Sequence, residues 1–397
     1  MSKNNQNKLI PTLRFPEFNN DGEWEEKALN KLGKLVNGLT YSPDDVKEEG
    51  LLVLRSSNIQ NGVIVLDDNV YVRTDVKGVN LSEPNDILIC VRNGSKALIG
   101  KNALIPTGMP LCTHGAFMTV FRSDKSKFIF QLFQTKTYIK KVAGDLGATI
   151  NSINGSNFLK YEFLVPKNPD EQNKIAAFLS SLDEVITAET QKLELLQDHK
   201  RGLLQNLLPQ EGETVPKFRF KEFENSGEWE EKSFEELFEI GNGRDYKHLE
   251  NGNIPVYGSG GYMLSVNDFL YDGDSVCIGR KGTIDKPMFL TGKFWTVDTL
   301  FYTHSFKECL PKYVFYVFQN INWRNHNEAG GVPSLSKTNI YKIEIHIPKP
   351  KEQKIIADTL SSLDDLINVQ SQKVEALKLH KKGLLQGLFP KLNEATE

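Results

Sequence analysis

The sequence predicts an α+β protein in which two globular, β-rich domains are separated by a pair of long antiparallel coiled-coil helices, with an internal pseudo-twofold repeat. Three observations lead to this prediction. Residues 171–209 and 352–390 align at a constant offset of 181 without a gap, and 22 of the 39 positions are identical. Residues 13–38 return as 218–243 at an offset of 205. Between these repeats, short apolar runs alternate with turn residues, as in β-strands.

The repeats divide the chain into five segments. We expect a first globular domain with an N-terminal arm, a first long helix, a second globular domain, a second long helix and a short tail, at 1–168, 169–210, 211–348, 349–391 and 392–397. The two copies match at their edges and differ inside the globular segments. A recurring unit of this kind indicates one repeated scaffold that carries two different globular domains.

Both long repeats show a heptad pattern, in which seam residues alternate at spacings of four and three. The seam positions are 175, 179, 182, 186, 189, 193, 196, 200, 203 and 207 in the first copy and 356, 360, 363, 367, 370, 374, 377, 381, 384 and 388 in the second. About 35 residues give each helix a length of roughly 50 Å. Neither helix can bury its apolar face alone, so we expect the pair to form a rigid spacer; two amphipathic helices in a compact core are the alternative.

Polar residues interrupt both seams at the same two places. Glu189 is equivalent to Gln370, and Lys200 is equivalent to Lys381. A polar residue on a coiled-coil seam lowers stability but helps to fix register and orientation. In an antiparallel pair we expect Glu189 to approach Lys381 and Lys200 to approach Gln370, and we interpret all four residues as determinants of the helix register.

The apolar runs of the two globular domains predict short strands. We expect strands at 51–54, 63–66, 87–91, 116–121 and 161–165 in the first domain and at 253–257, 275–278, 295–297, 300–302 and 343–347 in the second. One helical stretch in each domain, at 128–141 and 311–321, completes an α+β body around an antiparallel sheet. We expect the aromatic residues in the cores rather than stacked on bases, namely Phe117, Tyr138, Trp295 and Trp323.

Cationic loops recur in the two domains. An Asn-Gly pair follows a leading helix in each copy, at 37–38 and 242–243, and farther along a strand ends in an Arg-x-Gly loop. Such a loop lets the backbone approach an anion while basic side chains bind phosphate or a guanine edge. An ordinary solvated hairpin turn is the alternative. The candidate DNA contacts are Arg92, Lys96, Arg280 and Lys281, with Asn93, Asn154 and Ser336 as weaker polar candidates.

Composition limits the classes of function. The net charge is −3, and basic and acidic residues number 14 and 12 in residues 41–165 and 11 and 10 in residues 241–348. This balance is far from the basic footprint of a free-standing DNA-binding protein, so a partner must supply part of the charge if nucleic acid is bound. No apolar run of 18 residues, no signal-peptide pattern and no CxxC motif is present, which predicts a cytoplasmic protein with four reduced thiols.

The sequence lacks the motifs of catalysis. It contains no G-x-x-x-x-G-K-[ST] phosphate loop, no Asn/Asp-Pro-Pro-aromatic tetrapeptide of amino-methyltransferases and no His/Cys/Asp cluster with metal-ligand spacing. We find no place to which a reaction can be assigned, and therefore interpret the chain as a recognition or scaffold protein.

These features resemble a known family over essentially the whole chain. The two helices share the motif Glu-Gln-x-x-Ile-Ala followed by Leu-Ser-Ser-Leu-Asp, at 171–183 and 352–364, and both end in (Lys/Arg)-Gly-Leu-Leu-Gln-x-Leu-(Leu/Phe)-Pro. The motif Gly-Glu-Trp-Glu-Glu recurs at 22–26 and 227–231. Together with the two dissimilar domains, these motifs resemble the specificity (S) subunit of type I restriction–modification enzymes.

The resemblance implies a division of labour. Each domain would be a target-recognition domain that reads one half of a bipartite, non-palindromic DNA target, and the helix pair would set the unread gap. Two modification (M) subunits would bind the chain and methylate adenine N6 with S-adenosylmethionine, and restriction (R) subunits, where present, would use ATP and Mg. The chain itself would need no cofactor. The first domain is 23 residues longer between shared landmarks, which we expect in its recognition loops.

Two rival interpretations belong to other classes. One is a cytoplasmic scaffold that binds only proteins. The other is an autonomous nuclease or methyltransferase with unrecognised motifs, which the missing motifs disfavour.

Overall fold

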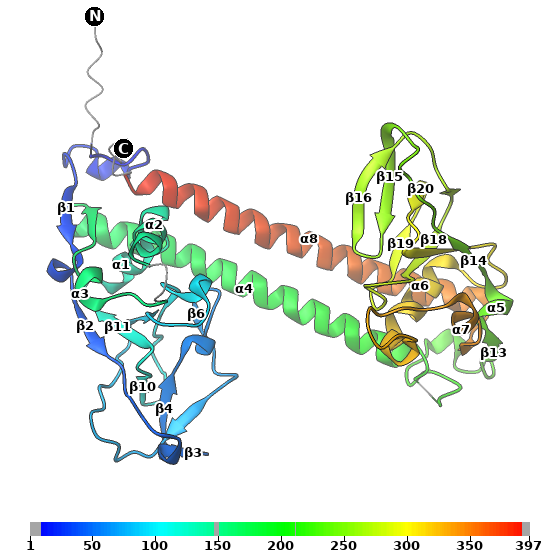
Figure 1. The fold of residues 1–397 in the computed structure, drawn as a ribbon, viewed down its shortest axis with the longest axis horizontal. Helices are drawn as coiled ribbons and strands as arrows, with labels where there is room; N and C mark the ends of the chain where they lie inside the picture. Colours follow the sequence, from blue (N-terminus) through cyan, green and yellow to red (C-terminus); the bar gives the residue numbers. More distant parts are fainter. Residues whose placement is uncertain (1–8, 147–150, 211, 391–397) are drawn as a thin grey trace, which may run out of the picture. The chain divides into compact units, whose positions relative to one another are not determined.

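The computed structural model describes residues 9–146, 151–210 and 212–390, and the chain divides into two compact units. Unit 1 comprises Met1–Ala188 and Val374–Glu397, and unit 2 comprises Glu189–Lys373. Each unit therefore combines one globular domain with part of each long helix; the helices and domains are drawn in Figure 1. The division runs through the middle of the helices rather than at their ends, where the sequence placed the segment boundaries. The first eight residues of the expected arm and the whole tail lie outside the described residues.

Unit 1 contains two four-stranded sheets and two small ones. One large sheet is antiparallel in the order β2-β11-β8-β9, and the other has the order β10-β4-β7-β3 with a parallel β10–β4 pair. The small sheets are β1-β12 and β5-β6. The strands are β1 Glu25–Ala28, β2 Lys34–Asn37, β3 Val46–Lys47, β4 Leu51–Leu54, β5 Ile59–Gln60, β6 Val63–Ile64, β7 Val70–Val72, β8 Ile87–Cys90, β9 Asn102–Leu104, β10 Cys112–His114, β11 Met118–Arg122 and β12 Glu162–Val165. The short helices are α1 Ser126–Leu132, α2 Lys136–Asp145 and α3 Gly155–Phe158.

Unit 2 repeats this plan with changes. Its antiparallel sheet has the order β14-β21-β18-β19, its mixed sheet the order β16-β15-β20-β17 with a parallel β15–β20 pair, and its small sheet is β13-β22. The strands are β13 Glu230–Ser233, β14 Glu239–Asn242, β15 Asn251–Gly258, β16 Gly261–Val266, β17 Tyr271–Asp272, β18 Ser275–Gly279, β19 Met288–Leu290, β20 Lys293–Thr296, β21 Leu300–His304 and β22 Glu344–Ile347. The short helices are α5 Phe234–Leu237, α6 Pro311–Asn320 and α7 Lys337–Tyr341.

Short 3-10 turns join several of these elements. They lie at Pro16–Phe18, Leu29–Lys31, Pro43–Asp45, Ser56–Asn58, Lys96–Leu98, Lys221–Phe223 and Trp323–His326.

The strand pairings locate the extra residues of the first domain. Asn37 and Asn242 occupy equivalent sites on β2 and β14, and Met118 and Leu300 occupy equivalent sites on β11 and β21. The offset between equivalent residues is 205 at the first pair and 182 at the second. The additional residues of the first domain therefore lie between β2 and β11. Most of them are in segment 55–89, which contains β5, β6 and β7.

The two long helices are α4, Pro169–Leu207, and α8, Pro350–Leu388, each 39 residues long. Both begin at a proline, whose missing N–H is not needed in the first turn of a helix. None of the predicted seam positions is exposed. The core of unit 1 contains the start of α4 and the end of α8, and the core of unit 2 contains the end of α4 and the start of α8. Within each unit the helices therefore pack antiparallel along the predicted seam.

A buried ion pair attaches the leading segment of each domain to the start of a long helix. Arg14 donates from Nε and Nη2 to the two carboxylate oxygens of Glu171, each over 2.7 Å, and Trp24 Nε1 donates to the same carboxylate over 3.3 Å. Arg219, Glu352 and Trp229 repeat the arrangement in unit 2, with distances of 2.8, 2.8 and 3.3 Å. These contacts explain why the sequence repeats at the domain edges.

The predicted strands are all present, but the sequence missed about half of the strands of the described chain. Most of the missed strands lie at sheet edges or in two-stranded sheets, and β7, which lies inside a sheet, has only three residues. The leading helix expected before the Asn-Gly pair is wrong for the first domain, where β1 and β2 flank a short 3-10 turn, and only the four-residue α5 lies there in the second. The helical stretch at 128–141 is two helices, because Thr135 caps the start of α2 by accepting a hydrogen bond from Tyr138 N.

Candidate nucleic-acid interface

One hydrogen-bond frame holds the cationic loop in both domains. In the first, Val91 N and Arg92 N donate to Phe117 O over 3.0 and 3.1 Å, and Ile153 N donates to Val91 O. In the second, the main-chain N–H groups of 280 and 281 donate to the carbonyl of 299, and the N–H of 335 donates to the carbonyl of 280. The cationic loops therefore have the same backbone support in both domains.

This frame corrects the alignment that the shared Arg-x-Gly letters indicate. The isolated bridges join Arg92 to Ser152 and Lys281 to Ser334. Arg92 is therefore equivalent to Lys281, and Arg280 takes the place of Val91. The second loop presents two adjacent basic residues where the first presents one.

The four basic candidates are all exposed at these loops. The guanidinium of Arg92 lies 5.8 Å from the ring centroid of Phe117, within cation–π range. Lys96 lies in the same loop, at the start of a 3-10 turn. Arg280 and Lys281 form no ion pair with any other residue that the structure describes. Arg280 and Lys281 therefore suit phosphate or base contacts, because no described acidic residue neutralises their charges.

The three weaker polar candidates hold the surrounding loops in place. Asn93 Nδ2 donates to Ser56 Oγ over 3.2 Å, and its Oδ1 accepts from Ser95 N. Asn154 caps α3, and Ser336 caps α7 at the equivalent position. These contacts assign each residue a local structural role, and a role in DNA binding remains a prediction.

The repeated Asn-Gly pairs are explained by a close approach of two backbone segments. A Cβ on Gly38 would lie 2.1 Å from Gly115 O, and a Cβ on Gly243 would lie 1.9 Å from Val297 O. Only glycine fits such contacts. The following residue donates its N–H to the carbonyl of residue 114 in the first domain and of residue 296 in the second. The residues after each glycine are thereby held beside the cationic loop.

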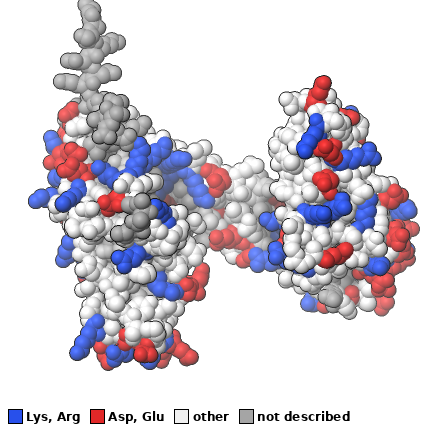
Figure 2. Space-filling model, viewed as in Figure 1, with Lys and Arg blue, Asp and Glu red and all other residues white. Residues whose placement is uncertain are grey.

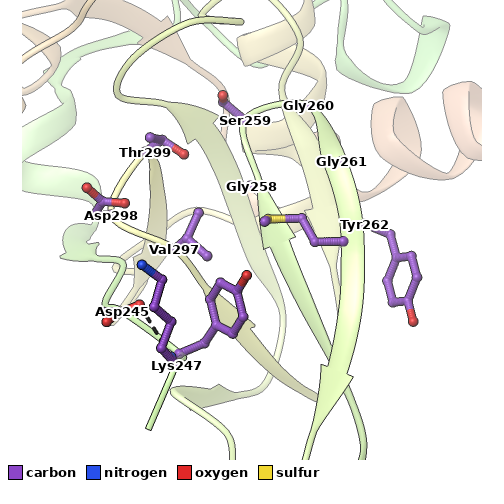
Figure 3. Close-up of a pocket in the computed structure, with 12 residues that line it drawn as sticks. Asp245, Lys247, Gly258, Ser259, Gly260, Gly261, Tyr262, Val297, Asp298 and Thr299 are labelled. Atoms are coloured by element: carbon purple, nitrogen blue, oxygen red, sulfur yellow. Dashed lines mark hydrogen bonds between the residues drawn. The ribbon is translucent and has the colours of Figure 1, made fainter. Parts of the chain in front are cut away.

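The second domain has a recess of about 570 Å³ next to its cationic loop (Figure 3). Residues 245–247, the β15–β16 turn at 258–263 and residues 297–299 line it. The exposed side chains of Asp245, Lys247 and Asp298 stand on one side, and the Tyr262 ring points away from the recess. The recess adjoins the cationic loop because Thr299 O accepts hydrogen bonds from that loop.

One aromatic prediction is wrong. Phe117 is 59% exposed, because the residue directly precedes β11 on a loop that faces solvent. Tyr138, Trp295 and Trp323 are buried, as expected. The sequence analysis also missed Asp245, Lys247 and Asp298. The available signal was their position in the sequence. Asp245 and Lys247 come just after the repeated Asn-Gly pair, and Asp298 comes just before β21, the strand that pairs with β14.

The polar seam residues have other partners than the predicted ones. Gln370 Nε2 donates to Glu189 O over 2.8 Å and to Glu189 Oε2 over 2.7 Å, and Lys373 Nζ lies 2.6 Å from Glu189 Oε1. These contacts, with the hydrogen bond from Gln370 first, hold the pKa of Glu189 below its usual value. The predicted approach of Glu189 to Lys381 is therefore wrong.

The two seam lysines each pair with an aspartate. Lys200 lies 2.6 Å from Asp364 in unit 2, and Lys381 pairs with Asp183 in unit 1. Lys200 therefore does not pair with Gln370. The two ion pairs are sequence-equivalent at the offset of 181, whereas Glu189 meets its own equivalent. These contacts are those of two helices that run antiparallel.

The described residues contain neither a group of three or more His, Cys, Asp or Glu side chains that could hold a metal ion nor a helix long and apolar enough to cross a membrane. Basic and acidic side chains are intermixed on the visible face of each unit (Figure 2). The surface in that view has no broad field of one sign, in agreement with the even charge balance of the two domains.

Comparisons with known proteins agree with the repeat. Residues 21–198 and 226–379 match the family described as the type I restriction modification DNA specificity domain. The EcoKI specificity subunit of Escherichia coli strain K12 is 24% identical over 93% of this chain and 88% of its own length. The MjaVIII specificity subunit of Methanocaldococcus jannaschii is 23% identical over 95% and 93%. The crystal structure of a type I restriction–modification S subunit from M. genitalium has the same fold, with a TM-score of 0.68, 17% identity and coverage of 97% of this chain and 100% of that one.

Proposed function

The chain belongs to the family of type I restriction–modification DNA specificity proteins, and from this premise we propose that each of its domains reads one half of a bipartite, non-palindromic DNA target. One observation carries the proposal: the same backbone frame supports an exposed basic loop in both domains, while the surrounding side chains differ. A shared frame would give both domains the same approach to DNA, and different side chains would give them different target sequences.

The helix pair supports a spacer role. Helices of 39 residues have a length of roughly 58 Å, which exceeds one turn of B-DNA at about 34–36 Å. The ion pairs between sequence-equivalent lysines and aspartates favour one register of the two helices. A fixed register would give a fixed number of unread base pairs between the two halves of the target.

Two M subunits would dock on the outer faces of the helices. Val185 on α4 and Leu366 on α8 are exposed apolar residues at sequence-equivalent positions, and Val369 lies one turn beyond Leu366. An exposed apolar side chain that recurs once in each copy suits two copies of one partner. The M subunits would carry S-adenosylmethionine and methylate adenine N6, and R subunits would supply ATP- and Mg-dependent cleavage. This chain would perform no catalysis, and its basic loops alone would bind DNA weakly without M.

Methylome sequencing tests this function. The gene is expressed with its M partner in a host that lacks adenine methylation. We expect methylated adenines in two short sequence blocks at a constant separation. A single continuous motif would contradict the two-reader assignment, and the absence of DNA binding by the assembled complex would favour the protein scaffold.

A further inference from the structure

The hydrogen-bond frame shows which residues take the same place in the two domains. The carbonyl that accepts from the cationic loop belongs to Phe117 in the first domain and to Thr299 in the second. The preceding residues, Ala116 and Asp298, are therefore equivalent. The N–H of the residue after the close-approach glycine bonds the carbonyl of 114 in one domain and of 296 in the other, which confirms the same alignment.

The same reasoning pairs the residues that follow the repeated Asn-Gly motif. Gly38 and Gly243 make the same close approach to the neighbouring strand end. Counting from these glycines, Ser42 in the first domain takes the place of Lys247 in the second, and Thr40 takes the place of Asp245.

The chemistry at these equivalent places is opposite. In the second domain, Asp298, Asp245 and Lys247 line the recess, and all three are exposed. In the first domain the same places hold the uncharged residues Ala116, Thr40 and Ser42, and the ring of the adjoining Phe117 is 59% exposed. Both sets are exposed and lie in segments that directly follow or precede strands.

The charges of the recess select against phosphate. Two carboxylates at its wall repel the DNA backbone, and Asp298 forms no hydrogen bond or ion pair with another residue that the structure describes. A carboxylate with free acceptor capacity suits the exocyclic amino group of cytosine or adenine, and the ammonium of Lys247 suits the ring and carbonyl acceptors of a neighbouring base. The adjoining pair Arg280 and Lys281 can hold the phosphates.

The exposed ring of the first domain suits a different base. Apolar side chains recognise the C5 methyl group of thymine in the major groove. The guanidinium of Arg92, 5.8 Å from the Phe117 ring centroid, can contact the neighbouring phosphate or guanine.

The geometry points to residues 117 and 298 as specificity determinants: Asp298 accepts a hydrogen bond from the amino group of a cytosine or adenine in the second half-site, and Phe117 contacts a thymine methyl group in the first. This inference rests on the proposed function of the two domains and names the base chemistry that each domain reads.

The test uses the full chain assembled with its M partner. The wild-type motif is determined first by methylome sequencing, and the same experiment is repeated with Asp298→Ala, Phe117→Ala and the control Asp272→Ala, which removes an exposed carboxylate outside the recess. Asp298→Ala should relax one cytosine or adenine position in one half-site by roughly 5- to 150-fold, and Phe117→Ala one thymine position in the other half. The control should leave the motif unchanged.

Base analogues give a second readout, which also serves if a variant abolishes methylation. The binding of the wild-type and Asp298→Ala complexes is measured on duplexes in which purine replaces each adenine, or 2-pyrimidinone each cytosine, of the second half-site. Removal of one amino group should weaken wild-type binding and leave the variant almost unaffected. Suppose that the wild type methylates a bipartite motif, that Asp298→Ala and Phe117→Ala methylate the same motif, and that the Asp298 variant responds to the base analogues as the wild type does. The inference is then wrong while the proposed function stands. If the wild type neither methylates nor binds a bipartite motif, the proposed function itself fails.

Discussion

Removal of the Glu352 carboxylate is expected to destabilise unit 2 selectively. Its side chain is 3% exposed and that of Arg219 is 13% exposed, and the carboxylate accepts three hydrogen bonds from Arg219 and Trp229. The variant Glu352→Ala leaves a largely buried guanidinium and a buried indole N–H without this carboxylate as their acceptor. Loss of one member of a buried ion pair costs about 3–5 kcal/mol.

The size of unit 2 converts this cost into a temperature. For 150–250 residues, each kcal/mol lowers the Tm by about 2–4 °C, so we expect a shift of about 6–20 °C. Calorimetry measures the shift, and hydrogen exchange of peptides from each unit assigns it, because a chain with two units need not unfold in one step. Glu171→Ala should loosen unit 1 instead.

The control is Glu344→Ala, which removes an exposed carboxylate from the same unit. A Glu352→Ala shift no larger than that of the control would refute the assignment of the ion pair as the attachment of the leading segment. An equal increase in hydrogen exchange in both units would refute the expectation that loss of the Glu352 carboxylate destabilises unit 2 alone.

Three further predictions concern the loops and the helix seam. Arg280→Ala is tested in the complex with M. If Arg280 contacts phosphate, the variant should bind all DNA sequences more weakly, and the slope of log affinity against log salt concentration should fall by about 1. If it contacts a base, the variant should relax one target position at a cost of about 1–3 kcal/mol; unchanged affinity and target would exclude both contacts. Lys200→Asp should lower stability by about 1–3 kcal/mol, and adding Asp364→Lys should recover most of it; thermal melts that show no recovery would mean the pair does not couple. The pKa of Glu189 is lower in the folded chain than in the unfolded chain. The stability that its carboxylate contributes is therefore present above the unfolded pKa and is lost as the pH falls through the folded pKa. The Tm difference between wild type and Glu189→Gln should shrink below pH 4.5. A constant difference would contradict this.

The long helices could be predicted because a heptad pattern depends only on local spacing, and the gapless repeat showed it twice. The partners across the seam could not be predicted from spacing alone. They depend on the register of the antiparallel helices, and the register in unit 2 brings Glu189 against its own equivalent Gln370. Charge matching alone had favoured Lys381, which follows Gln370 by 11 residues in the sequence and pairs with Asp183 instead.

The candidate interface was predicted in part. The basic loops were recognised because Arg and Lys beside Gly at a strand end form a local pattern. The acidic recess residues were missed, since Asp245 and Asp298 are far apart in sequence and meet only because the two strand ends lie side by side. Phe117 was placed in the core on hydrophobicity, but its position on the loop before β11 leaves the ring in solvent. Matching letters in the loops also gave the wrong alignment, which the backbone hydrogen bonds correct by one residue.

Insertion of one heptad into both long helices, followed by methylome sequencing with the M partner, tests the central claim most directly. Seven residues add about 10 Å to each helix, and the seam keeps its register because the insertion is a whole repeat. If the helices set the distance between two separate readers, both half-sites will keep their sequences while the number of unread base pairs between them increases. A changed half-site with an unchanged gap would contradict this account.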